Sequence, residues 1–239
     1  MLARNRIADG HEAHEAFAQT LRRNNGFPAD RAERPETIDN LGLSALQAVT
    51  GSLEGPQGLH APTLFVALGA LAGYAAKWAV ALDIADGRVS DDFRLQPGEG
   101  RRSVVYSDHV RDLVAGLSRQ SALSIVLGAA TRANASSFAK LEALTHRAIL
   151  PGRANAMPDY SVEARHFPQF APEALLMMLW ENIGRTFRAE RRPRGDLALG
   201  LAFAAAHALS AWRSELSVET AATLFVESAL AMSKIDRAF

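Results

Sequence analysis

The residues with the clearest chemical potential lie near the start of the chain, in the segment His11-Glu12-Ala13-His14-Glu15. Two imidazoles and two carboxylates so close together could bind a metal ion or exchange protons. The zincin motif HExxH places its histidines four positions apart on one helix face. Here they are three apart, and the inverted motif HxxEH is also absent. The spacing leaves His11 and His14 as weak metal-ligand candidates that need a third ligand from elsewhere, so the sequence alone assigns no metal site.

Three further candidates lie in the most apolar parts of the sequence. Lys77 and Trp78 occur in the apolar run 61–86, and His207 occurs in the segment FAAAHALSAW. A lysine among apolar residues can have a lowered pKa, and a histidine there can act as a general base. Each can equally be a core residue with a satisfied hydrogen bond. We expect these residues to line the walls of a pocket between two central helices, if the protein has one.

The segment 151–171 carries the remaining candidates. It is rich in proline, has no helical periodicity, and contains Tyr160, Arg165 and His166. Loops of this length are uncommon in compact domains and often have a function. We therefore expect a long proline-rich loop or lid that brings these three side chains to a ligand.

Two weaker patterns involve acidic and hydroxyl residues. Asp83 and Asp86, followed by Asp91 and Asp92, could hold Mg²⁺ and a diphosphate, but the chain has only the DxxD spacing, and a helix end followed by a polar turn has the same residues. Ser103, Ser107, Asp108 and His109 imitate part of a hydrolase triad. No GxSxG elbow and no alternation of strands and helices accompanies them, so we do not infer a hydrolase.

The composition excludes several classes of protein. The 239 residues include 26 basic and 26 acidic residues, so no overall charge favours nucleic acid or an anionic membrane. There is no cysteine, which excludes disulfides and thiolate metal sites. The first residues lack the apolar run of a signal peptide. We expect a cytoplasmic protein with no nucleic-acid partner.

The apolar run 61–86 is long enough to cross a membrane, and Gly69 and Gly73 in it have the GxxxG spacing of closely packed helices. Lys77 lies inside this run, and its many alanines and glycines lower its hydrophobicity. We interpret it as a buried central helix, because a helix that is apolar all round is usually surrounded by protein.

The remaining periodicity is helical. The sequence predicts an all-α fold, a single globular domain over residues 1–239 with about seven to nine helices, and a small β-hairpin inserted near residues 93–106. Ser107, Asp196 and Ser217 are expected to cap helix N-termini.

For the function we expect a soluble interaction or small-ligand-binding module that forms a homo-oligomer, since small residues favour close packing and no catalytic motif is present. The alternative is an all-helical enzyme acting on a small anionic or apolar substrate between the central helices. That alternative requires at least two of the three elements Lys77, His207 and the 151–171 loop to converge on one cleft. Whether the protein is an enzyme stays open, and no cofactor is indicated.

Overall fold

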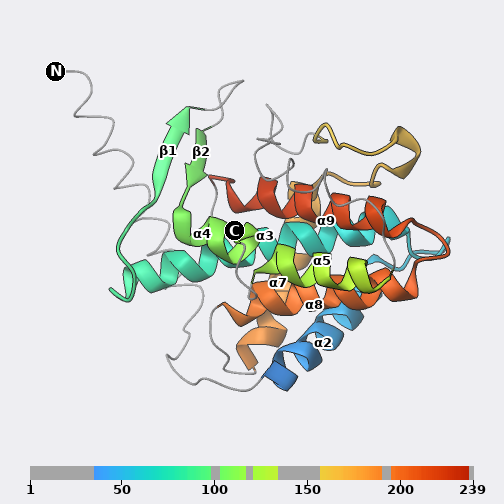
Figure 1. The fold of residues 1–239 in the computed structure, drawn as a ribbon, viewed down its shortest axis with the longest axis horizontal. Coiled ribbons are helices and arrows are strands. Elements are labelled where there is room, and N and C mark those ends of the chain that lie inside the picture. The colour runs from blue at the N-terminus through green and yellow to red at the C-terminus, as the bar shows by residue number, and fades with distance from the viewer. Residues whose placement is uncertain (1–34, 98–102, 117–120, 134–156, 190–194, 237–239) are drawn as a thin grey trace.

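The computed structural model describes residues 35–97, 103–116, 121–133, 157–189 and 195–236. Within these ranges the chain forms seven α-helices, one short 3-10 helix and one hairpin, which confirms the predicted all-α fold with a hairpin insertion (Figure 1). In chain order the elements are α2 (Pro35–Leu53), α3 (Ala61–Ala85), β1 (Arg94–Pro97), β2 (Ser103–Tyr106), α4 (Asp108–Ala115), α5 (Ala122–Arg132), η2 (Ala164–His166), α7 (Pro172–Ala189), α8 (Asp196–Ala211) and α9 (Val218–Ser233). The segment with His11 and His14 lies outside the described residues.

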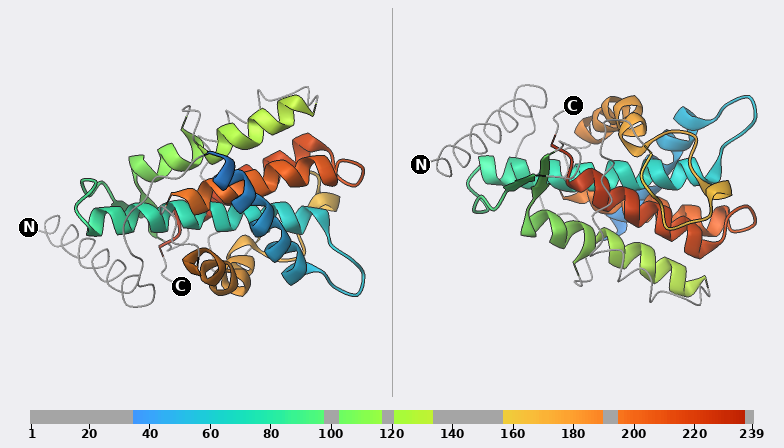
Figure 2. Two further views of the ribbon diagram at one scale, coloured as in Figure 1. Left: turned by 90° about the horizontal axis from the view of Figure 1, so that it is seen from below. Right: turned by 90° about the horizontal axis from the view of Figure 1, so that it is seen from above.

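Helix α3 is the centre of the fold. It runs along the long dimension of the molecule, with α7, α8 and α9 packed against it (Figure 2). All of its residues from Ala61 to Leu82 are buried. Within the described parts of the chain it is the one helix long and apolar enough to cross a membrane, and its most apolar window is entirely covered by protein. It is therefore a core helix, as the apolar run predicts.

The contact between α3 and α9 depends on two glycines. A Cβ atom at Gly69 would overlap the carbonyl oxygen of Phe225, and one at Gly73 would overlap that of Ala229. The later glycine meets the later residue of α9, so α3 and α9 run in the same direction. Their backbones are closer than a side chain at either glycine would allow. This brings the C-terminal ends of α3 and α9 to the same end of the molecule.

A second close contact joins α2 to α8. A Cβ atom at Gly42 would lie 2.6 Å from Cβ of Phe203, and one at Gly200 would lie 2.9 Å from Cδ2 of Leu41. The two helices run antiparallel through this contact. As a consequence Asp39, one turn before Gly42, lies beside the C-terminal half of α8.

The hairpin is attached to the chain that follows α9. Strands β1 and β2 pair antiparallel, with Leu95 opposite Val105. The backbone N–H of Val105 donates to the carbonyl of Lys234 at 3.0 Å, and Val104 forms a β-bridge with Ile235. An isolated hairpin is marginally stable in water, so these contacts to the end of α9 help to hold it in place.

Candidate functional site

Lys77 lies in the core, with 1% of its surface exposed. Its Nζ donates a hydrogen bond to the carbonyl of Ile235, just beyond α9. Burial lowers the pKa of Lys77 to about 8, and the charge of Asp236 opposes part of that change. Lys77 thus links the end of α9 to α3.

Trp78, on the next position of α3, belongs to an aromatic cluster between α3 and α7. Its ring meets that of Trp180 edge to face, with 6.0 Å between centroids, and Tyr74 meets the same ring at 4.6 Å. Such pairs favour this geometry because of the ring quadrupoles. The surroundings of Trp78 are those of a packed core residue.

The loop residue Tyr160 is also buried. Its hydroxyl is 3.1 Å from Oγ of Ser228, and the N–H of Ser161 donates to both oxygens of the fully buried Glu227, at 3.0 and 3.2 Å. Burial raises the pKa of the Tyr160 phenol, the Ser228 hydrogen bond opposes this, and the charge of Glu227 adds to it. The described part of the loop is therefore anchored on α9.

The other end of this loop is anchored on α3. The N–H of Gln169 donates to Oγ1 of Thr63 at 2.9 Å, and Nδ1 of His60 lies 2.8 Å from the same oxygen. Between the two anchors, Arg165 is exposed and pairs with the exposed Glu163 at 2.8 Å, and His166 ends the 3-10 helix η2. Neither Arg165 nor His166 lines the two polar cavities described below.

His207 is the residue among the predicted ligand-binding side chains that lines a described cavity. Its Nε2 lies 2.9 Å from Oδ1 of Asp39 on α2, and both side chains are partly exposed. A carboxylate can only accept a hydrogen bond, so Nε2 carries the proton that it donates. In the neutral imidazole Nδ1 is then the acceptor. The antiparallel packing of α2 against α8 brings Asp39 and His207 together.

The cavity beside this pair has a volume of about 290 Å³. It lies where α2, α5 and α8 meet, and its lining combines charged and small apolar side chains. The lining residues are Asp39, Ala129, Arg132, Ala133, Phe203, Ala206, His207, Ser210 and Arg213. We call it the His207 cavity. Its size is close to the lower end of the range for small-molecule sites, about 300 Å³.

The two arginines of the His207 cavity are available to a ligand. Arg132 is the last residue of α5, and Arg213 follows the C-cap of α8. Cations are favoured at helix C-termini because of the helix dipole. Neither guanidinium forms an ion pair with another described residue. The lining therefore has the positive charges of two arginines against the single negative charge of Asp39.

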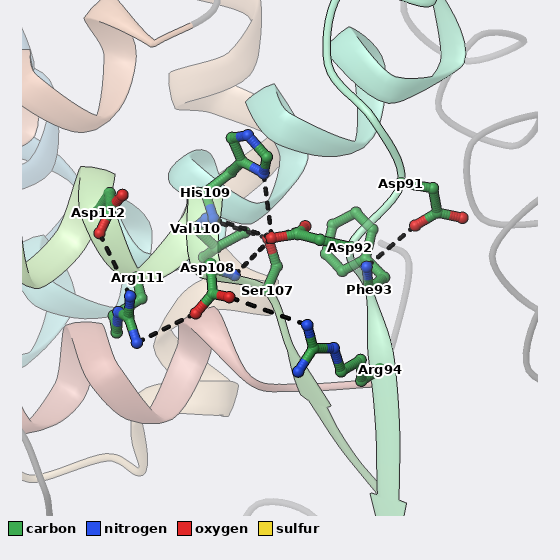
Figure 3. Close-up of polar contacts among 10 residues, drawn as sticks. All are labelled: Asp91, Asp92, Phe93, Arg94, Ser107, Asp108, His109, Val110, Arg111 and Asp112. Atoms are coloured by element: carbon green, nitrogen blue, oxygen red, sulfur yellow. Dashed lines mark hydrogen bonds and ion pairs between the residues drawn. The ribbon is translucent and has the colours of Figure 1, made fainter.

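A second polar centre surrounds Asp92, which precedes β1 (Figure 3). Its Oδ1 accepts from Oγ of Ser107 at 2.6 Å. Its Oδ2 accepts from the N–H groups of Asp108 and His109, at 2.6 and 3.2 Å, and lies 3.0 Å from Nδ1 of His109. Burial raises the pKa of Asp92, but these hydrogen bonds outweigh that effect and hold the pKa below its ordinary value.

This centre is a helix cap and lacks the order of a hydrolase triad. The hydroxyl of Ser107 contacts Asp92 and accepts from the N–H of Val110 at 3.2 Å, while His109 contacts the other carboxylate oxygen. In a triad the histidine lies between the nucleophile and the carboxylate, so that it can take the nucleophile's proton. Here the carboxylate lies between the two, and it ties the chain before β1 to the start of α4.

Beside this cap lies another cavity, of about 200 Å³, at the base of the hairpin. Its walls come from β1, β2, α4 and the end of α9. They comprise Asp92, Arg94, Val105, Tyr106, Ser107, Asp108, Val110, Arg111, Leu230, Ser233 and Lys234. We call it the hairpin cavity. It shares no lining residue with the His207 cavity.

Among the described residues no group of three histidine, aspartate or glutamate side chains could hold a metal ion. The hypothesis that His11 and His14 bind metal falls outside those residues and stays a prediction.

Sequence reasoning missed most of the residues that line the two cavities. Asp39 is 168 positions from His207 and no local pattern connects the two. One feature of the sequence could have indicated Arg132 and Arg213, since each lies at the end of an apolar helical stretch. Lys234 had a signal as well, since it follows the apolar stretch of the last helix. No protein-family model, curated protein or solved structure matches this chain.

Proposed function

We propose that the protein is a small-ligand-binding module whose ligand is a small anion, a carboxylate or a phosphate, held in the His207 cavity. The observation that carries this proposal is that Arg132 and Arg213 line one cavity and form no ion pair with other described residues. Guanidinium groups bind carboxylate and phosphate oxygens in pairs of parallel hydrogen bonds. The pair of His207 and Asp39 supplies a further polar contact beside them.

The apolar part of the lining limits the ligand. Phe203, Ala129 and Ala206 lie on the same cavity as the two arginines. A ligand that fills about 290 Å³ can therefore place its anionic group on the arginines and a short carbon skeleton against these side chains. This combination favours a small organic acid or phosphate ester over a bare inorganic ion.

The experiment is a calorimetric titration of the full chain with succinate and, separately, with inorganic phosphate. Wild type is compared with Arg132→Gln and Arg213→Gln. Each substitution is expected to weaken binding by about tenfold to 100-fold, because a hydrogen bond to a charged group contributes about 1.5–3 kcal/mol. Arg165→Gln is the matched control, since Arg165 is exposed, pairs with Glu163 and lies outside this cavity. Equal affinity in wild type and both cavity variants would exclude the proposal.

An enzymatic role in the same cavity is the second candidate, and one observation favours it. Asp39 fixes the Nε2–H tautomer of His207, so Nδ1 is free to act as a base in the neutral ring. Ser210, one turn further along α8, lines the same cavity. Hydrolysis of p-nitrophenyl acetate or phosphate by wild type, lost in His207→Gln and retained in His109→Gln, would support this role. Absence of turnover in wild type counts against it.

Self-association is the remaining part of the proposal. Five large apolar side chains are exposed, and they lie on α2, α7 and the loop before α7: Leu43, Met157, Phe170, Met177 and Met178. A contiguous exposed apolar patch often marks a contact between subunits, and Met177 and Met178 are neighbours on α7. Sedimentation velocity is expected to show a concentration-dependent oligomer that Met177→Glu weakens. A strict monomer over the whole concentration range would count against self-association.

A further inference from the structure

Several basic side chains line the hairpin cavity, and one of them is the amine of Lys234. Arg94 on β1, Arg111 on α4 and Lys234 at the end of α9 all line it, at a volume of about 200 Å³. Arg94 and Arg111 lie on either side of the hairpin turn, and Lys234 comes from the far end of the sequence. The attachment of the hairpin to the chain after α9 is what brings them together.

Both the backbone and the side chain of Lys234 contact the hairpin in this cavity. Its carbonyl accepts from the N–H of Val105 at 3.0 Å, and its Nζ lies 5.3 Å from the ring centroid of Tyr106, which also lines the cavity. No carboxylate among the described residues forms an ion pair with it. The side chain is half-buried, and burial lowers its pKa, so more of its amine is uncharged at neutral pH than in a solvated lysine.

The two arginines retain hydrogen-bonding capacity for an anion. Both contact Asp108, which lies 4.0 Å from Arg94 and 3.1 Å from Arg111, and Arg111 also lies 3.7 Å from Asp112. Each guanidinium has five N–H donors, and these contacts do not use all of them. The other acid of the lining, Asp92, already accepts hydrogen bonds from the start of α4 on both of its oxygens.

We propose that the hairpin cavity binds a small anionic aldehyde or ketone and holds it as an imine on Lys234, with Arg94 and Arg111 binding the anionic group. The lone pair of the neutral amine forms a C–N bond to the carbonyl carbon as the C=O π bond breaks, and one of the two amine protons passes to the carbonyl oxygen. The nitrogen then gives up its second proton, the C–O bond breaks, and the hydroxyl group leaves with that proton as water while the C=N bond forms. One amine and one carbonyl give one imine and one water, and nothing is oxidised or reduced.

The lysine content of the chain makes this proposal easy to resolve by mass spectrometry. The sequence contains three lysines: Lys77, Lys140 and Lys234. Lys77 is 1% exposed and donates to a backbone carbonyl, so it is shielded from reagents. Lys140 lies outside the described residues and is quantified as a separate peptide.

The test incubates the full chain with glyoxylate at neutral pH and reduces any imine with cyanoborohydride. Acetaldehyde, which has the aldehyde but no carboxylate, is the paired reagent. Each rate is divided by the rate for the same lysine in the urea-unfolded chain, which removes the intrinsic difference between the reagents. For Lys234 the glyoxylate rate is expected to exceed the acetaldehyde rate by about tenfold, which corresponds to about 1.4 kcal/mol from charge-assisted contacts.

The variants assign the effect to the cavity. In the Arg94→Gln, Arg111→Gln double variant the ratio is expected to fall to about one, with acetaldehyde labelling retained. Arg88→Gln is the matched control, because Arg88 is exposed, pairs with Asp83 and Asp86, and does not line the cavity. Lys234→Arg keeps the positive charge, and the labelled peptide that disappears in this variant is the one that contains Lys234. Labelling of Lys234 no faster than in the unfolded chain, or a ratio that the double variant leaves unchanged, would overturn the proposal. The result is independent of the His207 cavity.

Discussion

Replacement of the buried Lys77 by methionine tests the electrostatics of the core directly. The pKa of this lysine falls from its ordinary value of 10.5 to about 8 in the folded protein. Each pKa unit corresponds to about 1.36 kcal/mol, so the charged side chain costs about 3 kcal/mol of folding free energy at neutral pH. This cost is fully present below pH 8 and disappears as the pH rises from about 8 toward 10.5, because the folded protein releases its proton first.

The free energy of unfolding of wild type is therefore expected to rise by roughly 1.5 kcal/mol between about pH 8 and about pH 9.5. Urea unfolding followed by circular dichroism measures it. Lys77→Met should lose most of this rise. Lys234→Met should lose less of it, since Lys234 is only half-buried and its pKa is lowered in the same direction. The measurement stays below pH 10, where burial of Tyr160 begins to act in the opposite sense. A flat profile in wild type, or the same rise in Lys77→Met, would contradict a lowered pKa of Lys77 in the folded protein.

Three further predictions concern packing and polar contacts. Gly73→Ala should lower the free energy of unfolding by at least about 2 kcal/mol, because the added methyl group overlaps the backbone of α9. Gly51→Ala is the control on α2, where no atom lies near the new methyl group. In the same urea unfolding experiment it should raise the free energy of unfolding by about 0.5–1 kcal/mol. Asp92→Asn should cost about 1–3 kcal/mol at neutral pH. The pKa of Asp92 in the folded protein lies below its ordinary value. The ionised carboxylate therefore stabilises the fold at pH values above the ordinary pKa, and this stabilisation is lost as the pH falls through the folded pKa. The free energies of unfolding of wild type and Asp92→Asn should converge in acid. Tyr160→Phe removes a buried hydroxyl from Ser228 and should lower the thermal midpoint by an amount equivalent to about 1 kcal/mol; an unchanged midpoint would show that the hydrogen bond contributes nothing.

Local signals in the sequence predict most of the described helices. Ser107 and Ser217 accept from the backbone N–H groups of Val110 and Thr220, as expected of helix caps. The prediction for Asp196 was wrong, because Gly195 is the N-cap and no side chain caps the helix. Asp196 lies in the first turn instead, where its charge still favours the positive end of the helix dipole.

The positions of the candidate residues could not be predicted in the same way. Lys77 and His207 have apolar neighbours in the sequence, and Tyr160 lies in the proline-rich segment 151–171. The three side chains meet different partners: Ile235, Asp39 and Ser228. Neither cavity is lined by two of the three. Which helices pack together depends on long-range contacts such as that of Gly42 with Phe203, and no local periodicity encodes these pairings.

The arginine pair of the His207 cavity is the centre of the account, and a crystal structure of the full chain grown with selenate tests it most directly. Selenate is a tetrahedral dianion like hydrogen phosphate, and its anomalous signal locates it without ambiguity. If these arginines form the anion site, one selenate is expected in contact with both Arg132 and Arg213, beside His207. An empty cavity with selenate bound elsewhere on the protein would contradict it.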